Sequence, residues 1–378
     1  MPGSSMQPPD VRLKIPRPKA AIATPSTEVV KTMGQSLPGV IQDVVQLETL
    51  LSEPSEAAIA AMSKLDGDIM LLGAGGKMGP SLARMLLQAS RLAGRNRRVI
   101  ALSRFSSEQV KTQLAESGIE TITCDLRVEN AVESLPEVKN IIFMTGTKFG
   151  TNRQAARTWA MNVLLPARVC QRFRSSRILA FSTGNVYPFV STHGRGSVES
   201  DSLNPVGEYG MSALGRERIF EYHAQELDIP TTIVRLNYAV ETRYGVLVDL
   251  AQQVLSRQPI DLTMGFANVI WQADANAMAI AALIDASPEP FIINVAGDEI
   301  FSVASVCETF AAIFRRPLLL QGDSAETALL NNAERAYHRY GRPRVPLQRI
   351  IEWTADWLSR SLPILGKPTH FEIRNGQF

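Results

Sequence analysis

The stretch DIMLLGAGGKMG, residues 68–79, joins an apolar run typical of a buried strand to glycines that recur every three residues. Gly73, Gly76 and Gly79 would let the backbone turn tightly and approach a diphosphate, while a helix starting there would offer its free N–H groups. The sequence therefore predicts a dinucleotide-binding loop, with a tight turn that binds nothing as the alternative. The loop residues expected at the cofactor are Gly73, Gly75, Gly76, Lys77, Met78 and Gly79.

On both sides of this loop, strand-like runs alternate with helical patterns. Strands are expected at residues 68–72, 98–102, 120–123, 140–144, 177–181 and 231–236, and helices after Gly79, over 151–173 and over 209–227. This alternation predicts an α/β fold with right-handed crossovers and a doubly wound, Rossmann-type parallel sheet. Such sheets bind ligands beyond the carboxyl ends of their strands, so Thr145 and Gly146, after the fourth strand, are expected at the cofactor.

The ends of the second and third strands suggest which dinucleotide binds. Ser103 and Arg104 end the second strand, where an arginine suits the 2′-phosphate of NADP and an acid would suit the ribose of NAD. We therefore expect NAD(P) as cofactor, with NADP favoured, although Arg104 could also be an exposed loop cation. Asp125 and Leu126 follow the third strand and could hold the edge and face of adenine, or Asp125 could cap a helix.

Composition excludes several classes of function. The chain has 378 residues, 45% of them hydrophobic, and its 39 basic and 37 acidic residues leave a formal charge of +2. Without a charged run we expect no nucleic-acid partner, and because no apolar run reaches ~18 residues we expect no membrane span. Three distant cysteines suit a reducing cytoplasm, and four isolated histidines predict no metal site.

The chain is expected to have five parts. Residues 1–38 hold seven of the 22 prolines and predict a flexible leader, and residues 39–66 predict one or two amphipathic helices. Residues 67–236 should form the NAD(P)-binding domain, joined by later returning segments. Residues 237–366 are expected to form mainly a smaller substrate-binding lobe, and residues 367–378 a tail.

Polar and aromatic residues of the second half are candidates for the substrate site. Asn237 and Tyr238 follow the sixth strand and could hydrogen-bond a polyol, or they could form a polar loop at a domain junction. Trp271 is expected to line the same cleft. Trp353 and Trp357 are four residues apart on a C-terminal helical pattern, which favours a place in the core.

Together these motifs resemble the extended short-chain dehydrogenase/reductase family, which includes the NAD-dependent epimerases and dehydratases of sugar nucleotides. The family's glycine loop matches Gly73, Gly76 and Gly79, and its Ser-Thr-x-x-Val-Tyr strand end matches residues 182–187. Its catalytic tyrosine matches Tyr209, and its helix asparagine before the fifth strand matches Asn162. The resemblance covers roughly residues 67–360.

The resemblance implies a chemistry. In the family a tyrosine exchanges a proton with a hydroxyl group while the nicotinamide accepts or donates a hydride. Tyr209 would be this acid/base, Thr183 would hold the reacting oxygen, and Asn162 would bind the cofactor. The resemblance implies a sugar-like substrate, an epimerase, dehydratase or reductase activity, and a homodimer formed through helices 151–173 and 209–227.

The sequence departs from the family at the lysine that usually follows the tyrosine by four residues. That position is Ala213, so the phenol of Tyr209 is expected to stay protonated near neutral pH unless another cation compensates. Arg216 could be this cation, but its position favours an exposed helix arginine. The alternative function is therefore a non-catalytic NAD(P)-binding protein with a regulatory or partner-binding role.

Overall fold

The computed structural model describes residues 36–148, 150 and 153–377. The chain divides into two units, Met1–Pro38 and Gly39–Phe378, and every element described here belongs to the second. The predicted leader falls almost entirely outside the described residues.

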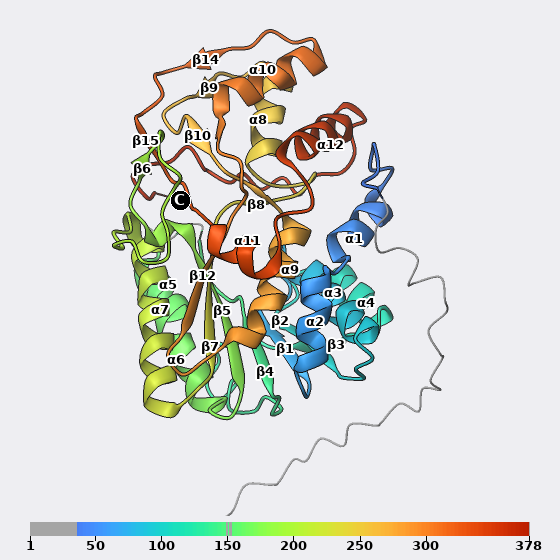
Figure 1. Ribbon diagram of the computed structural model, residues 1–378, viewed down its shortest axis with the longest axis vertical. Helices are drawn as coiled ribbons and strands as arrows, with labels where there is room; N and C mark the ends of the chain where they lie inside the picture. The colour runs from blue at the N-terminus through green and yellow to red at the C-terminus, as the bar shows by residue number, and fades with distance from the viewer. Residues whose placement is uncertain (1–35, 149, 151–152, 378) are drawn as a thin grey trace, which may run out of the picture. The chain divides into compact units, whose positions relative to one another are not determined.

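A seven-stranded parallel sheet forms the centre of the second unit (Figure 1). Its strands are β1 (Ile69–Leu72), β2 (Val99–Ser103), β3 (Glu120–Thr123), β4 (Asn140–Phe143), β5 (Arg177–Thr183), β7 (Thr231–Leu236) and β12 (Phe291–Val295). They lie in the order β12-β7-β5-β4-β1-β2-β3, so the direction of winding reverses between β1 and β4. The register places Leu72 beside both Leu102 and Phe143, which brings three strand ends together at this switch point.

Helices cover both faces of the sheet because its strands are apolar on both sides (Figure 1). On one face α3 (Gly79–Leu92) packs against α4 (Glu108–Glu116) and α9 (Gln272–Ala282). On the other, α6 (Leu165–Arg172) packs against α7 (Gly207–Leu227). The predicted doubly wound sheet is confirmed, and α7 begins two residues before Tyr209, so Tyr209 lies in its first turn.

The helix expected over residues 151–173 is interrupted by a wider turn. It consists of α5 (Ala155–Trp159), a π-helical turn over Ala160–Leu164, and α6. Asn162 lies within the π-helical turn and is fully buried. Such turns are rare and often occur at functional sites.

Two helices precede the sheet, where one or two were predicted. They are α1 (Val44–Ser52) and α2 (Glu56–Lys64), and the side chains of Asp43 and Ser55 cap them by accepting backbone N–H groups. α1 packs on α3, and α2 packs on α3 and α9. The extension is therefore part of the same compact unit as the sheet.

A smaller group of elements lies beyond the carboxyl ends of the strands (Figure 1). The helices α8 (Val246–Leu255), α10 (Val303–Phe314) and α12 (Leu347–Ser359) pack together, and α11 (Glu334–Tyr340) contacts β12. Four small sheets pair β6 (Val190–Ser191) with β15 (Thr327–Ala328), β8 (Ala239–Val240) with β11 (Ile270–Trp271), β9 (Ile260–Asp261) with β14 (Leu320–Gln321), and β10 (Phe266–Ala267) with β13 (Phe301–Ser302). The substrate lobe itself, with boundaries at 237 and 366, stays a prediction.

Trp353 and Trp357 are buried in the core, as their spacing predicted. Within the described ranges, no helix combines the length and the apolar character needed to cross a bilayer. The same residues contain no group of three or more His, Cys, Asp or Glu side chains that could hold a metal ion.

Candidate active site

Two adjoining cavities open where the strands end. The smaller, of about 450 Å³, lies along the ends of β1 to β4, and the larger, of about 1540 Å³, extends over β5 and β7. Residues of the smaller cavity predicted from sequence are Gly73, Gly75, Gly76, Ser103, Arg104, Asp125, Leu126, Thr145 and Gly146. Predicted residues of the larger are Lys77, Met78, Thr183, Tyr209, Asn237 and Tyr238. Several glycine-loop residues line both, so one extended ligand could occupy the pair.

The glycine loop leaves room for a ligand. A Cβ on Gly79 would lie 2.2 Å from the Ala74 carbonyl oxygen, so this glycine is required for the helix to meet the strand closely. A Cβ on Gly76 would meet only the Gly73 carbonyl, at 3.5 Å, so the fold itself does not require a glycine there. The buried Thr145 hydroxyl, in the cavity wall, has no hydrogen-bond partner among the described residues. These features suit a dinucleotide whose diphosphate lies over Gly76.

Replacing Gly76 by alanine should therefore impair binding without impairing folding. We expect the variant to unfold at the same or a higher temperature. Alanine reduces the conformational entropy of the unfolded chain, which raises the free energy of unfolding by about 0.4–1 kcal/mol. Its methyl group would occupy ligand space, and we expect Kd for the dinucleotide to rise at least about tenfold (~1.4 kcal/mol). Titration calorimetry measures this, with Gly39→Ala, also free of close contacts, as control. Unchanged affinity would place the diphosphate elsewhere.

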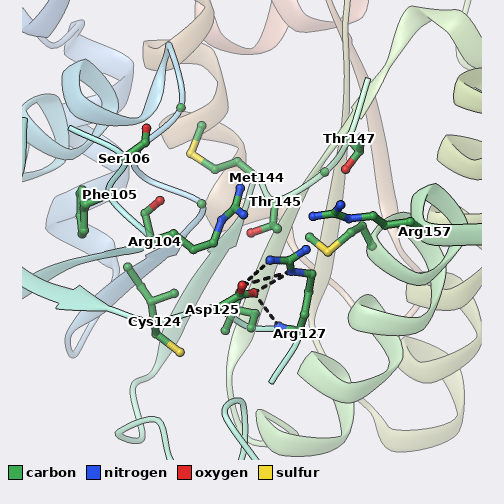
Figure 2. A pocket seen from close by; sticks show the side chains of 18 residues that line it. Arg104, Phe105, Ser106, Cys124, Asp125, Arg127, Met144, Thr145, Thr147 and Arg157 are labelled. Atoms are coloured by element: carbon green, nitrogen blue, oxygen red, sulfur yellow. Dashed lines mark hydrogen bonds and ion pairs between the residues drawn. The ribbon is translucent and has the colours of Figure 1, made fainter. Parts of the chain in front are cut away.

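Arginines surround the smaller cavity. Figure 2 shows the guanidinium groups of Arg104, Arg127 and Arg157 directed toward one another across it. Asp125 accepts two hydrogen bonds from Arg127 Nε and Nη2, and these hold the pKa of its carboxyl at about 2. Asp125 also accepts the Arg127 backbone N–H, forming a turn rather than the helix cap considered from sequence. The wall thus carries net positive charge, which suits a phosphorylated ribose.

Thr183 and Tyr209 come together in the larger cavity. Thr183 ends β5, which runs two residues further than the sequence predicted, and is 7% exposed. Its hydroxyl donates to Asn185 Oδ1 (3.0 Å) and accepts from the Asn185 backbone N–H (3.2 Å). Tyr209 reaches the same cavity from the first turn of α7. The two hydroxyl-bearing side chains can therefore face one substrate.

A buried polar junction lies beside this pair. The Asn162 side chain accepts from the Thr147 N–H (3.0 Å) and donates to the Thr147 carbonyl (3.1 Å) and to Ser212 Oγ (2.9 Å). Asn162 lines neither cavity, so it supports the Thr147 loop rather than exposing its amide to a ligand. Asn162 lies in the π-helical turn, which does not follow the 3.6-residue period of an α-helix. Its orientation could therefore not be predicted from the spacing of apolar residues.

Arg216 belongs to this junction, and the expectation of an exposed helix arginine is wrong. It is 6% exposed and lines the larger cavity. Its guanidinium donates to the Phe181 carbonyl (2.9 Å) and to Asn162 Oδ1 (2.8 Å), while Nε has no partner among the described residues. Burial lowers its pKa, and the nearby Tyr209 and Glu217 oppose the shift. A buried guanidinium bonded to neutral acceptors retains its positive charge close to Tyr209.

The position of the family's lysine is closed. Ala213 is fully buried and packs with Val186 and Tyr187. A longer side chain there would have to displace these groups. Arg216 reaches the cavity instead. Gly146 makes room for its guanidinium, because a Cβ at that position would lie only 2.5 Å from Arg216 Nη2.

Two of the three residues predicted for the substrate site line the larger cavity. Asn237 is buried and donates to Asn268 Oδ1, and Tyr238 lines the cavity with φ +38°, a strained conformation for a bulky residue. Burial raises the pKa of Tyr238, which keeps its phenol a hydrogen-bond donor. Trp271 lies elsewhere: it is 1% exposed, packs on Trp353 and lines neither cavity, so we leave it out of the site.

Sequence reasoning missed two lysines of the larger cavity, Lys148 and Lys367. Lys148 follows β4 in the same loop as Thr145, so its place after a strand was a usable signal. Lys367 lies in the tail, where no sequence pattern indicated a site.

The fold and this arrangement can be compared with known proteins. The model of the NAD dependent epimerase/dehydratase family matches residues 69–262, which is just over half of the chain. The chain belongs to the NAD dependent epimerase/dehydratase family. The extended short-chain dehydrogenase/reductase resemblance inferred from the motifs is confirmed. The search of curated proteins found no match to this chain.

Solved structures share its fold. One is UDP-glucuronic acid 4-epimerase from Bacillus cereus in complex with NAD, with 17% identity and a TM-score of 0.64, covering 78% of this chain and 96% of that one. Another is dTDP-glucose 4,6-dehydratase from Bacillus anthracis in complex with NAD (13%, TM-score 0.65, 78% and 96%). A third is the UDP-glucose 4-epimerase of Thermus thermophilus, also with NAD (17%, TM-score 0.64, 78% and 100%).

Proposed function

We propose that this protein is an NAD(P)-dependent epimerase, dehydratase or reductase that acts on a hydroxyl or carbonyl group of a sugar or sugar nucleotide. The observation that carries the proposal is that Thr183 and Tyr209 line one cavity, which adjoins the glycine loop. The similar structures named above are an epimerase of UDP-glucuronic acid, a dehydratase of dTDP-glucose and an epimerase of UDP-glucose.

Each side chain has a part in this chemistry. The glycine loop, Thr145 and Arg104 would hold the dinucleotide, which when bound supplies the hydride acceptor or donor. Tyr209 would take the proton from a substrate hydroxyl or return it to a carbonyl oxygen. Thr183 would turn its hydroxyl from Asn185 to the same oxygen and fix its position. Arg216 would supply the positive charge that the family obtains from lysine, stabilising negative charge on the phenol.

A direct test uses the full chain loaded with NADP⁺ or NAD⁺ and offered UDP-glucose, UDP-glucuronate or dTDP-glucose. We expect reduced nicotinamide to appear in the absorbance spectrum, or a sugar isomer or dehydration product in the NMR spectrum. Nucleotide released by denaturing the purified protein separates the activities, since retained NAD suits an internal epimerase cycle and exchangeable NADPH suits a reductase. Neither signal with any sugar would contradict the proposal.

For the cofactor we propose a preference for NADP, supported by the arginines of the smaller cavity. Replacing Arg104 by serine would remove a charge-assisted hydrogen bond to the 2′-phosphate, worth about 1.5–3 kcal/mol. We therefore expect Kd for NADP⁺ to rise about 10–100-fold while Kd for NAD⁺ changes little. Fluorescence titration of both dinucleotides measures this. Arg174→Ser, an exposed arginine between α6 and β5, is the control. Equal losses for both dinucleotides would show that Arg104 does not read the 2′ position.

We also propose a homodimer formed by the helices on the α6 and α7 face. Large apolar side chains are exposed along them: Trp159 on α5, Leu164 in the π-helical turn, and Met211 and Tyr222 on α7. A second copy could cover these side chains. Light scattering at micromolar concentration should give a dimeric mass, and a monomeric mass would reject this interface.

The alternative, a non-catalytic NAD(P)-binding protein, was motivated by Ala213. Arg216 weakens that motivation, because its guanidinium lies close to Tyr209. It comes from the helical turn of α7 that follows Ala213.

A further inference from the structure

The N-terminal extension forms part of the wall of the larger cavity. Five residues of α1 line it: Val44, Val45, Glu48, Thr49 and Ser52. All of them precede residue 69, where the match to the family model begins. The cavity of this chain therefore has a wall that the family model does not cover, and this wall carries one charged side chain, that of Glu48.

Glu48 joins two arginines that come from different parts of the chain. Its Oε2 lies 2.5 Å from Nη1 of Arg84 on α3, and its Oε1 lies 2.7 Å from Nη1 of Arg243. Both arginines also line the cavity. α3 begins at Gly79 of the glycine loop, whereas Arg243 belongs to the segment between β8 and α8. One carboxylate thus ties together two walls of the cavity.

The setting of these ion pairs favours a real contribution. Fully exposed ion pairs contribute little, because water and salt screen the charges. The side chains of Glu48, Arg84 and Arg243 are all partly buried, so screening is weaker here. Among the described residues Arg84 forms no other ion pair, and Arg243 forms one more, with Glu241 (2.9 Å). Loss of the Glu48 charge would therefore separate the two arginines from each other.

Arg243 lies in a tight turn that its own side chain helps to hold. Glu241 and Tyr244 exchange both backbone hydrogen bonds, at 3.0 Å for the Glu241 N–H and 3.2 Å for the Tyr244 N–H. Between them, the backbone N–H and the Nε of Arg243 both donate to the Glu241 carboxylate (2.7 and 2.9 Å). A group that fixes the Arg243 guanidinium therefore also fixes the position of Tyr244.

Tyr244 brings this 241–244 turn to the glycine loop. The Nζ atom of Lys77 lies 3.1 Å from the centroid of the Tyr244 ring, which is a cation–π contact. Both residues line the larger cavity. Lys77 is one of the loop residues expected at the diphosphate, so Tyr244 lies next to the place where the dinucleotide would bind. A connected path thus runs from Glu48 through Arg243 and Tyr244 to the glycine loop.

This path affects how a bound dinucleotide would leave. Along the glycine loop it would be enclosed on one side by the Tyr244 ring, and its release would require the 241–244 turn to move away from the loop. Opening motions of this kind limit ligand release in many enzymes. The ion pairs of Glu48 oppose the motion, because one arginine is fixed on α3 and the other on the turn.

We propose that Glu48 is a positioning residue of the dinucleotide site: it holds the 241–244 turn to α3, keeps the Tyr244 ring on Lys77, and thereby slows release of the bound dinucleotide. The inference rests on the dinucleotide site of the proposed function, but it requires no turnover. Slow release suits an enzyme that restores its cofactor within one reaction cycle, such as an epimerase, more than a reductase that exchanges its dinucleotide in every cycle.

The dissociation rate of the dinucleotide tests this role. The full chain is loaded with NADPH and mixed in a stopped-flow instrument with an excess of NADP⁺, and the fall in NADPH fluorescence gives the rate constant of release. Glu48→Gln removes the charge and keeps the size of the side chain. We expect this variant to release NADPH about tenfold faster than the unmodified chain, equivalent to ~1.4 kcal/mol. Its association rate should change little, since most changes in affinity act on dissociation.

The sign of the effect separates closure from simple electrostatics. Removing a carboxylate from a cavity that takes an anionic dinucleotide would by itself strengthen binding, so charge alone predicts slower release. Glu53→Gln is the matched control: Glu53 follows α1 and pairs with Arg344 (2.8 Å), but neither of these residues lines a cavity. The side chains of Glu48 and Glu53 are 28% and 26% exposed, respectively. Unchanged or slower release from Glu48→Gln, or equal acceleration by Glu53→Gln, overturns the proposal.

Variants of Tyr244 test the path from Glu48 to the loop. Tyr244→Phe keeps a ring over Lys77 and should release NADPH at the normal rate, whereas Tyr244→Leu should accelerate release. If both residues act through one contact, the chain carrying Glu48→Gln and Tyr244→Leu should release NADPH no faster than Tyr244→Leu alone. Fully additive effects would overturn the proposal. If release follows the expected pattern but no sugar is ever converted, the proposed function fails and this role of Glu48 stands.

Discussion

Tyr209→Phe should lower turnover by about 10²–10⁴-fold, the usual contribution of a positioned acid/base, while NADP⁺ binds with nearly unchanged affinity. The substitution removes only the phenolic oxygen, so the ring that Lys148 faces is kept. The proton of the substrate hydroxyl then has no acceptor of comparable placement, because the Thr183 hydroxyl is a weaker base. Steady-state kinetics with the sugar that responds in the spectroscopic assay, together with a dinucleotide titration, measure the two quantities.

A second tyrosine of the same helix supplies the control. Tyr222 is 57% exposed on α7, so Tyr222→Phe should change neither turnover nor cofactor affinity. Thr183→Val, which removes the other hydroxyl, should lower turnover with retained binding if both groups hold one oxygen. Full turnover by the Tyr209 variant would assign the proton transfer to another group and reject the proposed mechanism.

The local sequence predicted the parallel sheet and the edge of it where the glycine loop lies. The run Ile69–Leu72 is apolar on both faces, and the glycines after it allow the tight turn between the strand and the helix. This βα unit can therefore be predicted from its own residues alone. The same applies to the ends of β2 and β4, where Arg104 and Thr145 occupy the expected edge. Adjacent parallel strands put these residues side by side whatever the rest of the chain does.

The junction around Arg216 could not be predicted in this way. Spacing placed Arg216 on the face of Tyr209 but could not show that it is buried. Its burial depends on the missing side chain of Gly146, on the Phe181 carbonyl and on Asn162, which lies in a π-helical turn that follows no 3.6-residue period. Contacts between residues far apart in sequence decide such a position.

Trp271 shows the opposite case. From sequence, Trp271 is expected to line the substrate cleft, yet it packs on Trp353 of α12, more than eighty residues away. Pattern alone could not distinguish a cleft from the interior of the neighbouring lobe. The tail lysine, Lys367, escaped notice for the same reason, since only tertiary contacts bring the tail to the site.

Arg216→Met is expected to lower turnover by about 10²–10³-fold, the typical loss when one preorganised electrostatic contact is removed. Methionine fills much of the same space without the charge. Arg216→Lys should recover most of the lost activity, because an ammonium group at this place restores positive charge beside Tyr209. If the methionine variant keeps full turnover, the cation does not act on the phenol and the enzyme works without a replacement for the family's lysine.

Stability distinguishes this role from a structural one. Arg235 on β7 is also buried, but it forms an ion pair with Glu217 (2.8 Å). The side chains of Arg235 and Glu217 are 2% and 0% exposed, respectively. Arg235→Met should therefore cost about 3–5 kcal/mol of unfolding free energy, since it leaves the buried Glu217 carboxylate without a counter-charge. Arg216 donates only to neutral acceptors. Its replacement removes a desolvated charge, which raises the free energy of unfolding, but it also takes a donor from two acceptors, which lowers it. These two effects on stability largely cancel. A large loss of activity with little change in the melting temperature would mark Arg216 as a cation kept for chemistry; a melting temperature that falls as far as in Arg235→Met would mark it as a structural residue.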